Sequence, residues 1–151
     1  MRHGSQPFAA LSLALAAGTL LTGAASGGTT VSITVTDLRN TKGVVRACMT
    51  DNAKVFPKCR EDANSFRAVV DAAGTVTFKF EHVPPGTYAI ALLHDENNNG
   101  KSDRALMMMP KEGYGFSRDA KVRMGPPSFK SAAFEVANQP LSQTIKMRYM
   151  L

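Results

Sequence analysis

The stretch from residue 86 to residue 103 constrains the fold more than any other, because an unbroken apolar run ends there in a polar loop. Successive side chains of a β-strand point to opposite faces, and in this run both faces are apolar. One face would carry Tyr88, Ile90, Leu92 and His94, and the other Ala89, Ala91 and Leu93. The run therefore predicts a strand that is buried on both faces.

The polar loop after this strand has the spacing of a calcium-binding loop. Such loops place side-chain oxygens at positions 1, 3, 5 and 9, a glycine at the sharp turn in position 6, and a backbone carbonyl at position 7. The predicted metal ligands are Asp95, Asn97, Asn99, the carbonyl of Lys101, and Asp103, with Gly100 at the turn. Calcium is the cofactor that this spacing predicts.

The calcium pattern is incomplete, because Leu106 stands where an EF-hand has its closing bidentate glutamate. The loop is therefore not an EF-hand. A second interpretation stays open, in which the loop is an Asx-rich turn without metal, since Asn and Asp side chains can hydrogen-bond their own backbone.

The first 25 residues have the three parts of a secretory signal peptide. Arg2 and His3 form a short basic region, residues 8–21 an apolar run, and residues 23–25 a small-residue cleavage site. The apolar run is shorter than the ~20 residues that span a membrane. We therefore predict a periplasmic or secreted protein that is not an integral membrane protein, with a signal peptide at 1–25 and one domain at 26–151.

Two cysteines, Cys48 and Cys59, remain in the predicted mature chain. In an oxidising compartment, a pair separated by a short polar loop is expected to form a disulfide. A metal or redox site is not favoured, because the chain has no C-x-x-C motif and no histidine between the two.

The formal charge of the chain is +6 at pH 7, and residues 101–130 contain seven basic residues against three acidic ones. This segment is a candidate contact for an anionic surface or glycan, although a solvated surface loop would have the same composition. The candidate anion-binding residues are Lys111, Arg118, Lys121 and Arg123. Nucleic acid is not predicted as a partner, because tryptophan and interleaved aromatic and basic residues are absent from the sequence.

Alternating apolar residues and turn-forming residues predict short strands along residues 26–151. The predicted strands are 31–35, 44–49 as the return strand after a turn at 39–43, 66–70, 76–80, 88–94, 132–136 and 141–149. Pro85 and Gly86 suit a type II turn, which would pair strand 76–80 with strand 88–94 in a hairpin. Residues 50–63 could form a loop or one short helical turn. The pattern indicates an all-β fold, an antiparallel β-sandwich.

Several ordered motifs resemble the domain-of-unknown-function 2141 family of exported bacterial proteins over about residues 31–149. The motifs are Phe78–Phe80, Pro85–Ala89, His94–Asp103, Pro110–Ser117 and Pro127–Phe129. The strand-turn-strand unit at 78–89 also resembles transthyretin-like (prealbumin-like) and carboxypeptidase-regulatory domains. This resemblance implies a sandwich of about seven strands and an exported protein, and it implies no established activity.

Few residues could form a catalytic site. After residue 25 the histidines are His82 and His94, and the sequence has no Gly-x-Ser-x-Gly motif. The C-terminal Tyr-Arg-Gly-Ser of the transthyretin-like hydroxyisourate hydrolases is also missing. We therefore predict an exported, non-catalytic binding or structural module with a calcium-type loop at one end. The alternative is a transthyretin-like hydrolase in which His94, beside Asp95, acts as the base.

Overall fold

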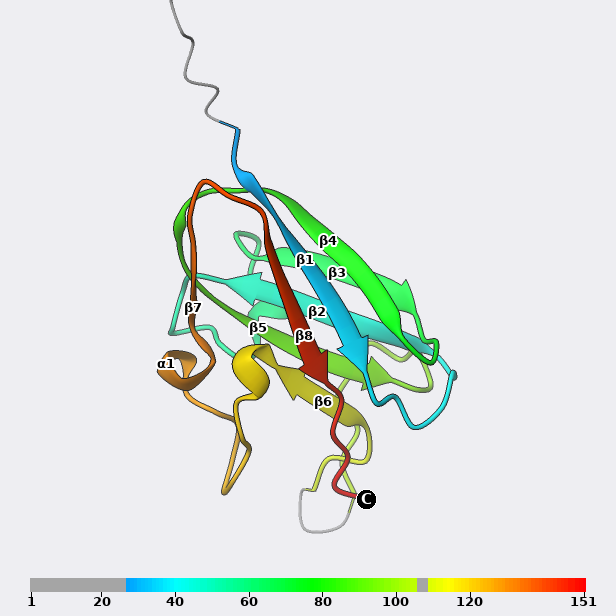
Figure 1. Cartoon of the computed structure of the whole chain (residues 1–151). Helices are drawn as coiled ribbons and strands as arrows, with labels where there is room; N and C mark the ends of the chain where they lie inside the picture. The colour runs from blue at the N-terminus through cyan, green and yellow to red at the C-terminus, as the bar shows by residue number, and fades with distance from the viewer. Residues whose placement is uncertain (1–26, 106–108) are drawn as a thin grey trace, which may run out of the picture.

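The computed structural model describes residues 27–105 and 109–151, so the predicted signal peptide at 1–25 lies outside the described residues. Two β-sheets pack face to face around a common core (Figure 1). The smaller sheet has the order β4 (Val76–Val83), β1 (Thr29–Thr36), β8 (Leu141–Lys146). The larger has the order β3 (Phe66–Asp71), β2 (Val44–Thr50), β5 (Gly86–Asp95), β6 (Gly113–Phe116), with β7 (Phe134–Val136) also paired to β5. This confirms the all-β sandwich, with eight strands in the described residues.

The core follows the alternation in the sequence. On β1 the side chains of Val31, Ile33 and Val35 are buried, whereas the residues between them are half exposed. Strand β5 is buried from Tyr88 to Asp95, which confirms the prediction of a strand covered on both faces. Its Tyr88, Ile90 and Leu92 side chains pack in the core between the sheets.

The predicted hairpin between strands 76–80 and 88–94 is wrong. Strand β4 pairs with β1, and β5 pairs with β2, β6 and β7, so the link between β4 and β5 crosses from one sheet to the other. Gly86 is not at positive φ but begins β5, opposite Val136. The residue shortly before this segment that has a positive φ is His82, with a φ of 56°. The type II turn is absent because Gly86 takes part in a strand ladder, which needs an extended backbone.

Two further expectations about pairing are also wrong. Strand β2 does not return beside β1 but lies in the larger sheet between β3 and β5. One edge of β1 is occupied by β4, and the other by β8, which runs parallel to β1 although an antiparallel fold was predicted. Most residues of β2 are buried, which suits a position inside the larger sheet better than one at its edge.

Short helical segments occupy positions where the sequence was ambiguous or misleading. The region 50–63 contains a 3-10 helix, η1 (Cys59–Glu61). Part of the predicted strand at 132–136 belongs to α1 (Phe129–Ala132), whose first turn is capped by the side chain of Ser128. A second 3-10 helix, η3 (Ser117–Asp119), follows β6. None of the helices in the described residues is long and apolar enough to cross a membrane.

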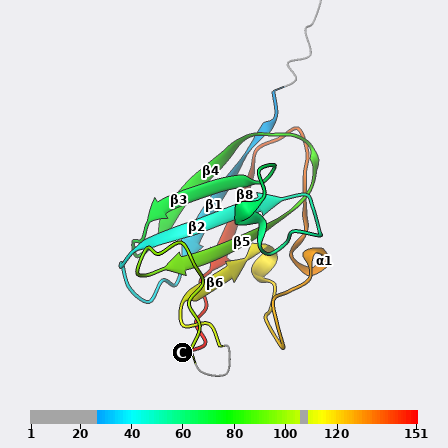
Figure 2. The same ribbon diagram turned by 180° about the vertical axis from the view of Figure 1, so that it is seen from behind.

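Figure 2 shows the molecule from the side of the larger sheet. The outer face of this sheet carries a second, smaller core. Cys48 on β2 is joined to Cys59 with a Cα–Cα distance of 5.7 Å, which confirms the predicted disulfide. The disulfide packs with Ala89, Ala91 and Phe116. Small side chains on the outer face of β5 therefore leave room for the 51–65 loop, which the disulfide ties to the sheet.

We expect Gly43→Ala to destabilise the domain by about 2 kcal/mol or more. Gly43 has φ +67°, and a Cβ atom there would clash with the carbonyl oxygen of Asp95. Gly74→Ala is the matched control, because a Cβ atom at Gly74 meets no atom within 4 Å and its φ is not positive. Urea denaturation of both variants measures the difference, and equal stabilities would contradict the tight contact at Gly43.

Candidate functional site

The predicted calcium loop begins at Asp95, the last residue of β5, whose side chain is fully buried. Its Oδ1 accepts a hydrogen bond from the Asn99 amide at 3.0 Å, and its Oδ2 accepts one from the Gly100 amide at 2.8 Å. Gly100 has φ +77°, as the sharp turn in the sequence pattern requires. The Asp95 carboxylate therefore organises the backbone of the loop.

Three of the predicted ligands converge at the far side of the loop. The Asn97 Nδ2 atom donates to Asp103 Oδ2 at 2.7 Å, and the Asn99 Nδ2 atom lies 3.0 Å and 3.1 Å from the two Asp103 oxygens. Both amide groups thus turn their donors toward one carboxylate. The structure thus brings Asn97, Asn99 and Asp103 together, through amide nitrogens rather than through the oxygens that a metal site would use.

Arg46 on β2 is a partner of the loop that the sequence did not indicate. Its Nε atom forms an ion pair with Asp95 Oδ2 at 2.6 Å, and its Nη2 atom donates to Asn98 Oδ1 at 2.7 Å. Burial alone would raise the pKa of the Asp95 carboxyl, but hydrogen bonds from Arg46, Gly100 and Asn99 outweigh burial and hold it below its usual value. Asp95 is therefore held in its charged form.

Glu112 is a second residue that sequence reasoning missed. In the β5–β6 register, His94 lies opposite Gly113. Continuing this register by one residue places Glu112 opposite Asp95. Its side chain is 4% exposed, Oε2 accepts from the Asp103 amide at 3.0 Å, and Oε1 has no hydrogen-bond partner among the described residues. Burial raises the pKa of the Glu112 carboxyl, and the charges of Asp103 and Asp95 act in the same direction. Because Glu112 is nine residues beyond Asp103, only the strand pairing could have indicated it.

These acidic groups do not form a compact metal centre by themselves. Within residues 27–105 and 109–151, no group of three or more His, Cys, Asp or Glu side chains could hold a metal ion. A cation in the loop would therefore need amide and carbonyl oxygens for most of its ligands, which is the ligand type that calcium accepts.

His94 lies beside Asp95 in sequence but faces the other side of the sheet. Its Nε2 atom is 2.8 Å from the Lys42 carbonyl oxygen, and its Nδ1 atom is 2.7 Å from the Tyr149 hydroxyl. A carbonyl can only accept, so Nε2 donates to Lys42, and the Tyr149 hydroxyl is positioned to donate to Nδ1. His94 thus ties β5 to the 37–43 loop and to the C-terminal segment.

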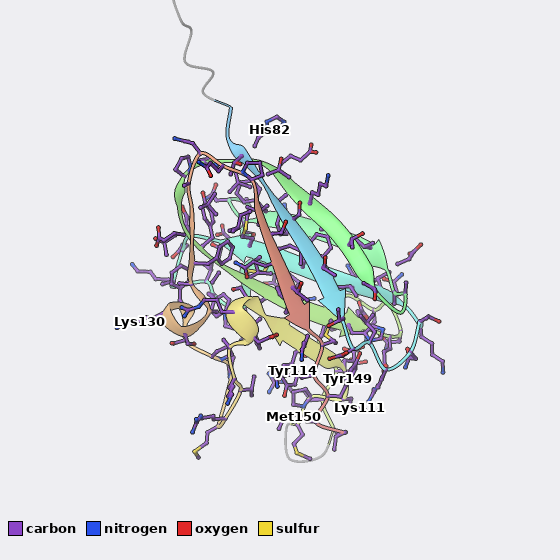
Figure 3. All side chains as sticks on the ribbon, viewed as in Figure 1. His82, Lys111, Tyr114, Lys130, Tyr149 and Met150 are labelled. Atoms are coloured by element: carbon purple, nitrogen blue, oxygen red, sulfur yellow. A yellow bond between two sulfur atoms is a disulfide. The ribbon has the colours of Figure 1, made fainter. Side chains whose placement is uncertain are left out.

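The predicted anion-binding residues lie in different places. Arg123 lines a groove on the outer face of the larger sheet, and Lys121 and Arg123 line a second, smaller hollow with Tyr114 and Tyr149. The Arg118 side chain donates to the Ala133 carbonyl at 3.2 Å. Lys111 is exposed near Tyr149, whereas Lys130 lies apart from it on α1 (Figure 3). The basic segment therefore does not form one continuous patch.

The fold and the loop define a β-sandwich domain with a polar, Asx-rich loop at one end of its central strand. The chain matches the family described as "Uncharacterized protein conserved in bacteria (DUF2141)" over residues 33–144, and it belongs to that family. Comparison with curated proteins and with solved structures gave no match.

We expect Glu96→Gln to lower stability by about 1 kcal/mol at pH 7, after allowance for the partial exposure of Arg39. Two hydrogen bonds from Arg39, both 2.7 Å long, lower the pKa of Glu96 to about 2 despite the opposing effect of burial. As the folded-state pKa is below the unfolded one, the stabilisation is present above about pH 4.5 and is lost toward about pH 2. The difference between wild type and Glu96→Gln should therefore shrink as urea denaturation is repeated at lower pH.

The control for this pH dependence is Glu81→Gln, because Glu81 is exposed on β4. Its effect should be small at every pH. A Glu96→Gln effect that stays constant down to about pH 3 would contradict the ion pair as its cause.

Tyr149→Phe should cost about 1–3 kcal/mol, because it leaves the Nδ1 atom of a buried histidine without a partner. It also removes the acceptor for the Arg39 amide at 3.2 Å. The matched control is Tyr114→Phe, since the Tyr114 hydroxyl makes no hydrogen bond with any described residue. Thermal denaturation measures both, and equal losses would show that the His94 contact contributes nothing.

Proposed function

We propose that this domain is an exported, non-catalytic binding module in which the loop 95–103 takes up a calcium ion. The observation that carries the proposal is the convergence of Asn97 and Asn99 on the Asp103 carboxylate, while Asp95 fixes the turn at Gly100. Three side chains from one loop thus meet at a common point, as a hard cation requires.

Calcium needs only a small rearrangement of these side chains. The oxygen and nitrogen of a side-chain amide exchange places when the group turns by about 180°, so Asn97 and Asn99 can present oxygens where their nitrogens now lie. Lys101 contributes its backbone carbonyl, and Glu112 supplies a buried carboxylate beside Asp103. Glu112 thereby adds the acidic group that the loop itself lacks at position 12.

The affinity should be low. Arg46 already neutralises Asp95, and the basic side chain of Lys101 is part of the loop. Two carboxylates within the loop and an adjacent guanidinium favour a dissociation constant of about 0.1–1 mM, the range of extracellular calcium modules. Such a site is useful where calcium is abundant, which agrees with export.

Export is supported by two features. The disulfide between Cys48 and Cys59 suits an oxidising compartment, and the sequence of residues 1–25 has the composition of a signal peptide. A periplasmic or secreted location is therefore part of the proposal. We also propose an anionic partner for the basic side chains of Lys111, Arg118, Lys121 and Arg123.

The absence of catalysis is supported by the environment of His94. The side chain is fully buried, and both ring nitrogens are engaged with Lys42 and Tyr149. A general base must reach a proton on the substrate, and His94 in this position has neither exposure nor an open nitrogen. We therefore favour a binding module over the hydrolase alternative.

We expect about 5 mM calcium to add roughly 1–2.3 kcal/mol to the stability of the folded domain. This corresponds to an increase in Tm of about 3–10 °C for a domain of this size. Differential scanning calorimetry of the purified domain, in calcium and in EDTA, measures it. An unchanged Tm in calcium and in magnesium would leave the loop as an Asx-rich turn without metal.

Asp103→Asn is the appropriate loop variant, because it keeps the shape of a partly exposed side chain and removes one ligand charge. It should remove most of the increase in Tm while changing the Tm in EDTA little. Asp95 is less suitable, since its loss would leave Arg46 and two loop amides without their acceptor. Asp71→Asn, at the exposed end of β3, is the charge-matched control and should retain the calcium response.

A further inference from the structure

A groove of about 940 Å³ runs over the outer face of β5 and β6, away from the core between the sheets. We call it the Arg60 groove. Its floor includes Ala91, Leu93 and Phe116, and its walls come from the segments 57–61, 100–104 and 122–126. The volume is that of a site for a small organic ligand.

The Arg60 groove has a strong excess of positive charge. Its lining contains six basic side chains against two acidic ones, Glu61 and Glu112. The basic residues are Arg46, Lys58, Arg60, Lys101, Arg104 and Arg123. They come from four separate parts of the chain, so no sequence segment reveals this concentration of charge.

Arg60 is a basic residue of this groove whose charge no described carboxylate compensates in an ion pair. It is half buried, and its guanidinium forms no hydrogen bond or ion pair with any described residue. Burial lowers the pKa of Arg60, and the nearby charge of Arg46 lowers it further. Nearby carboxylates, those of Asp95, Glu61 and Glu112, act in the opposite direction without forming an ion pair. Burying the charge of Arg60 without an ion pair costs free energy. An anion bound near the guanidinium groups of Arg46 and Arg60 would offset that cost.

The position of Arg60 is fixed by the fold. It follows Cys59 in η1, and the disulfide to Cys48 anchors that helix on β2. Arg46 is held from the other side by its bonds to Asp95 and Asn98. Two arginines on anchored backbone are pre-organised for an anion, because less conformational freedom is lost on binding.

The same groove offers apolar contact to a ligand. Among the large hydrophobic side chains that are exposed in the described residues, Met124 (105%) and Met150 (44%) both line it, as does the half-buried Met109. Methionine adapts its shape to apolar ligands. Figure 3 shows Met150 at the end of the sandwich near Tyr114, which also lines the groove.

We propose that the Arg60 groove binds a small anionic amphiphile, whose phosphate or carboxylate head lies between Arg46 and Arg60 and whose apolar chain covers Leu93 and Phe116. Both arginines line the groove, and guanidinium groups donate well to the oxygens of such a head group. The floor and the methionine side chains remove the apolar chain from water. The groove adjoins the calcium loop and shares Lys101 and Glu112 with the proposed calcium site, but anion binding in the groove does not require bound calcium.

Isothermal titration calorimetry with alkyl phosphates in EDTA, below their micelle concentrations, tests the proposal. Affinity should increase by about fourfold for each added methylene, because burying one CH₂ contributes ~0.8 kcal/mol and that energy corresponds to a factor of about four. Laurate should also bind. Inorganic phosphate should bind much more weakly, and a neutral alkyl maltoside should not bind at all. Affinity that is independent of chain length, or equal binding of the neutral compound, would overturn the proposal.

Arg60→Gln should weaken dodecyl phosphate binding about tenfold or more, which is the loss of affinity expected when one charge-assisted hydrogen bond is removed. Lys130→Gln is the matched control, because it removes the same charge from an exposed position on α1. Equal affinities of the two variants would exclude Arg60 as the head-group contact. The Tm of both variants without ligand shows that each is folded.

Discussion

The burial of β5 on both faces is the constraint on which the rest of the structure depends. A strand of this kind cannot lie at an exposed edge or surface, so other elements must cover both faces and pair with its backbone. In this domain β2, β6 and β7 pair with it. Its larger side chains fill the core between the sheets, and each such burial contributes about 1.5–3 kcal/mol. Its alanines face outward, where the disulfide and Phe116 pack closely.

At the end of β5, the buried side chain of Asp95 orders the polar loop that follows. Asp95 is buried because the strand carries it there, and a buried carboxylate is tolerated when it is paired and hydrogen-bonded. Arg46 and the amides of Asn99 and Gly100 meet that requirement. The same arginine also lines the groove on the outer face of the sheet. Gly100 and Lys101 of the loop line the groove too, so the loop and the groove are neighbours that share residues.

Much of the fold could be read from local patterns. Alternation on β1 and β4, the double burial of β5, the disulfide and the turn at Gly100 were all predicted, because each depends on residues close together in the chain. Two local predictions failed, the type II turn at Gly86 and the strand at 132–136, part of which is helical. The other predictions that failed concern which strands pair. The pairing of β4 with β5, the position of β2 and the parallel arrangement of β8 all involve a choice between strands that have similar apolar patterns.

The sequence by itself therefore determined the buried faces of β1, β4 and β5, the turn at Gly100, and which oxygen-bearing side chains are close together in the loop 95–103. The tertiary structure alone decided which strand lies beside which, and so which distant residues face the loop and the groove. Glu112 lies opposite Asp95 because of the β5–β6 register, and Arg60 lines the same groove as Arg46 because a disulfide holds η1 on β2. The physical reason is that hydrophobic burial is non-directional and selects a face for each strand, whereas the partner of that face is selected by the packing of all the elements together.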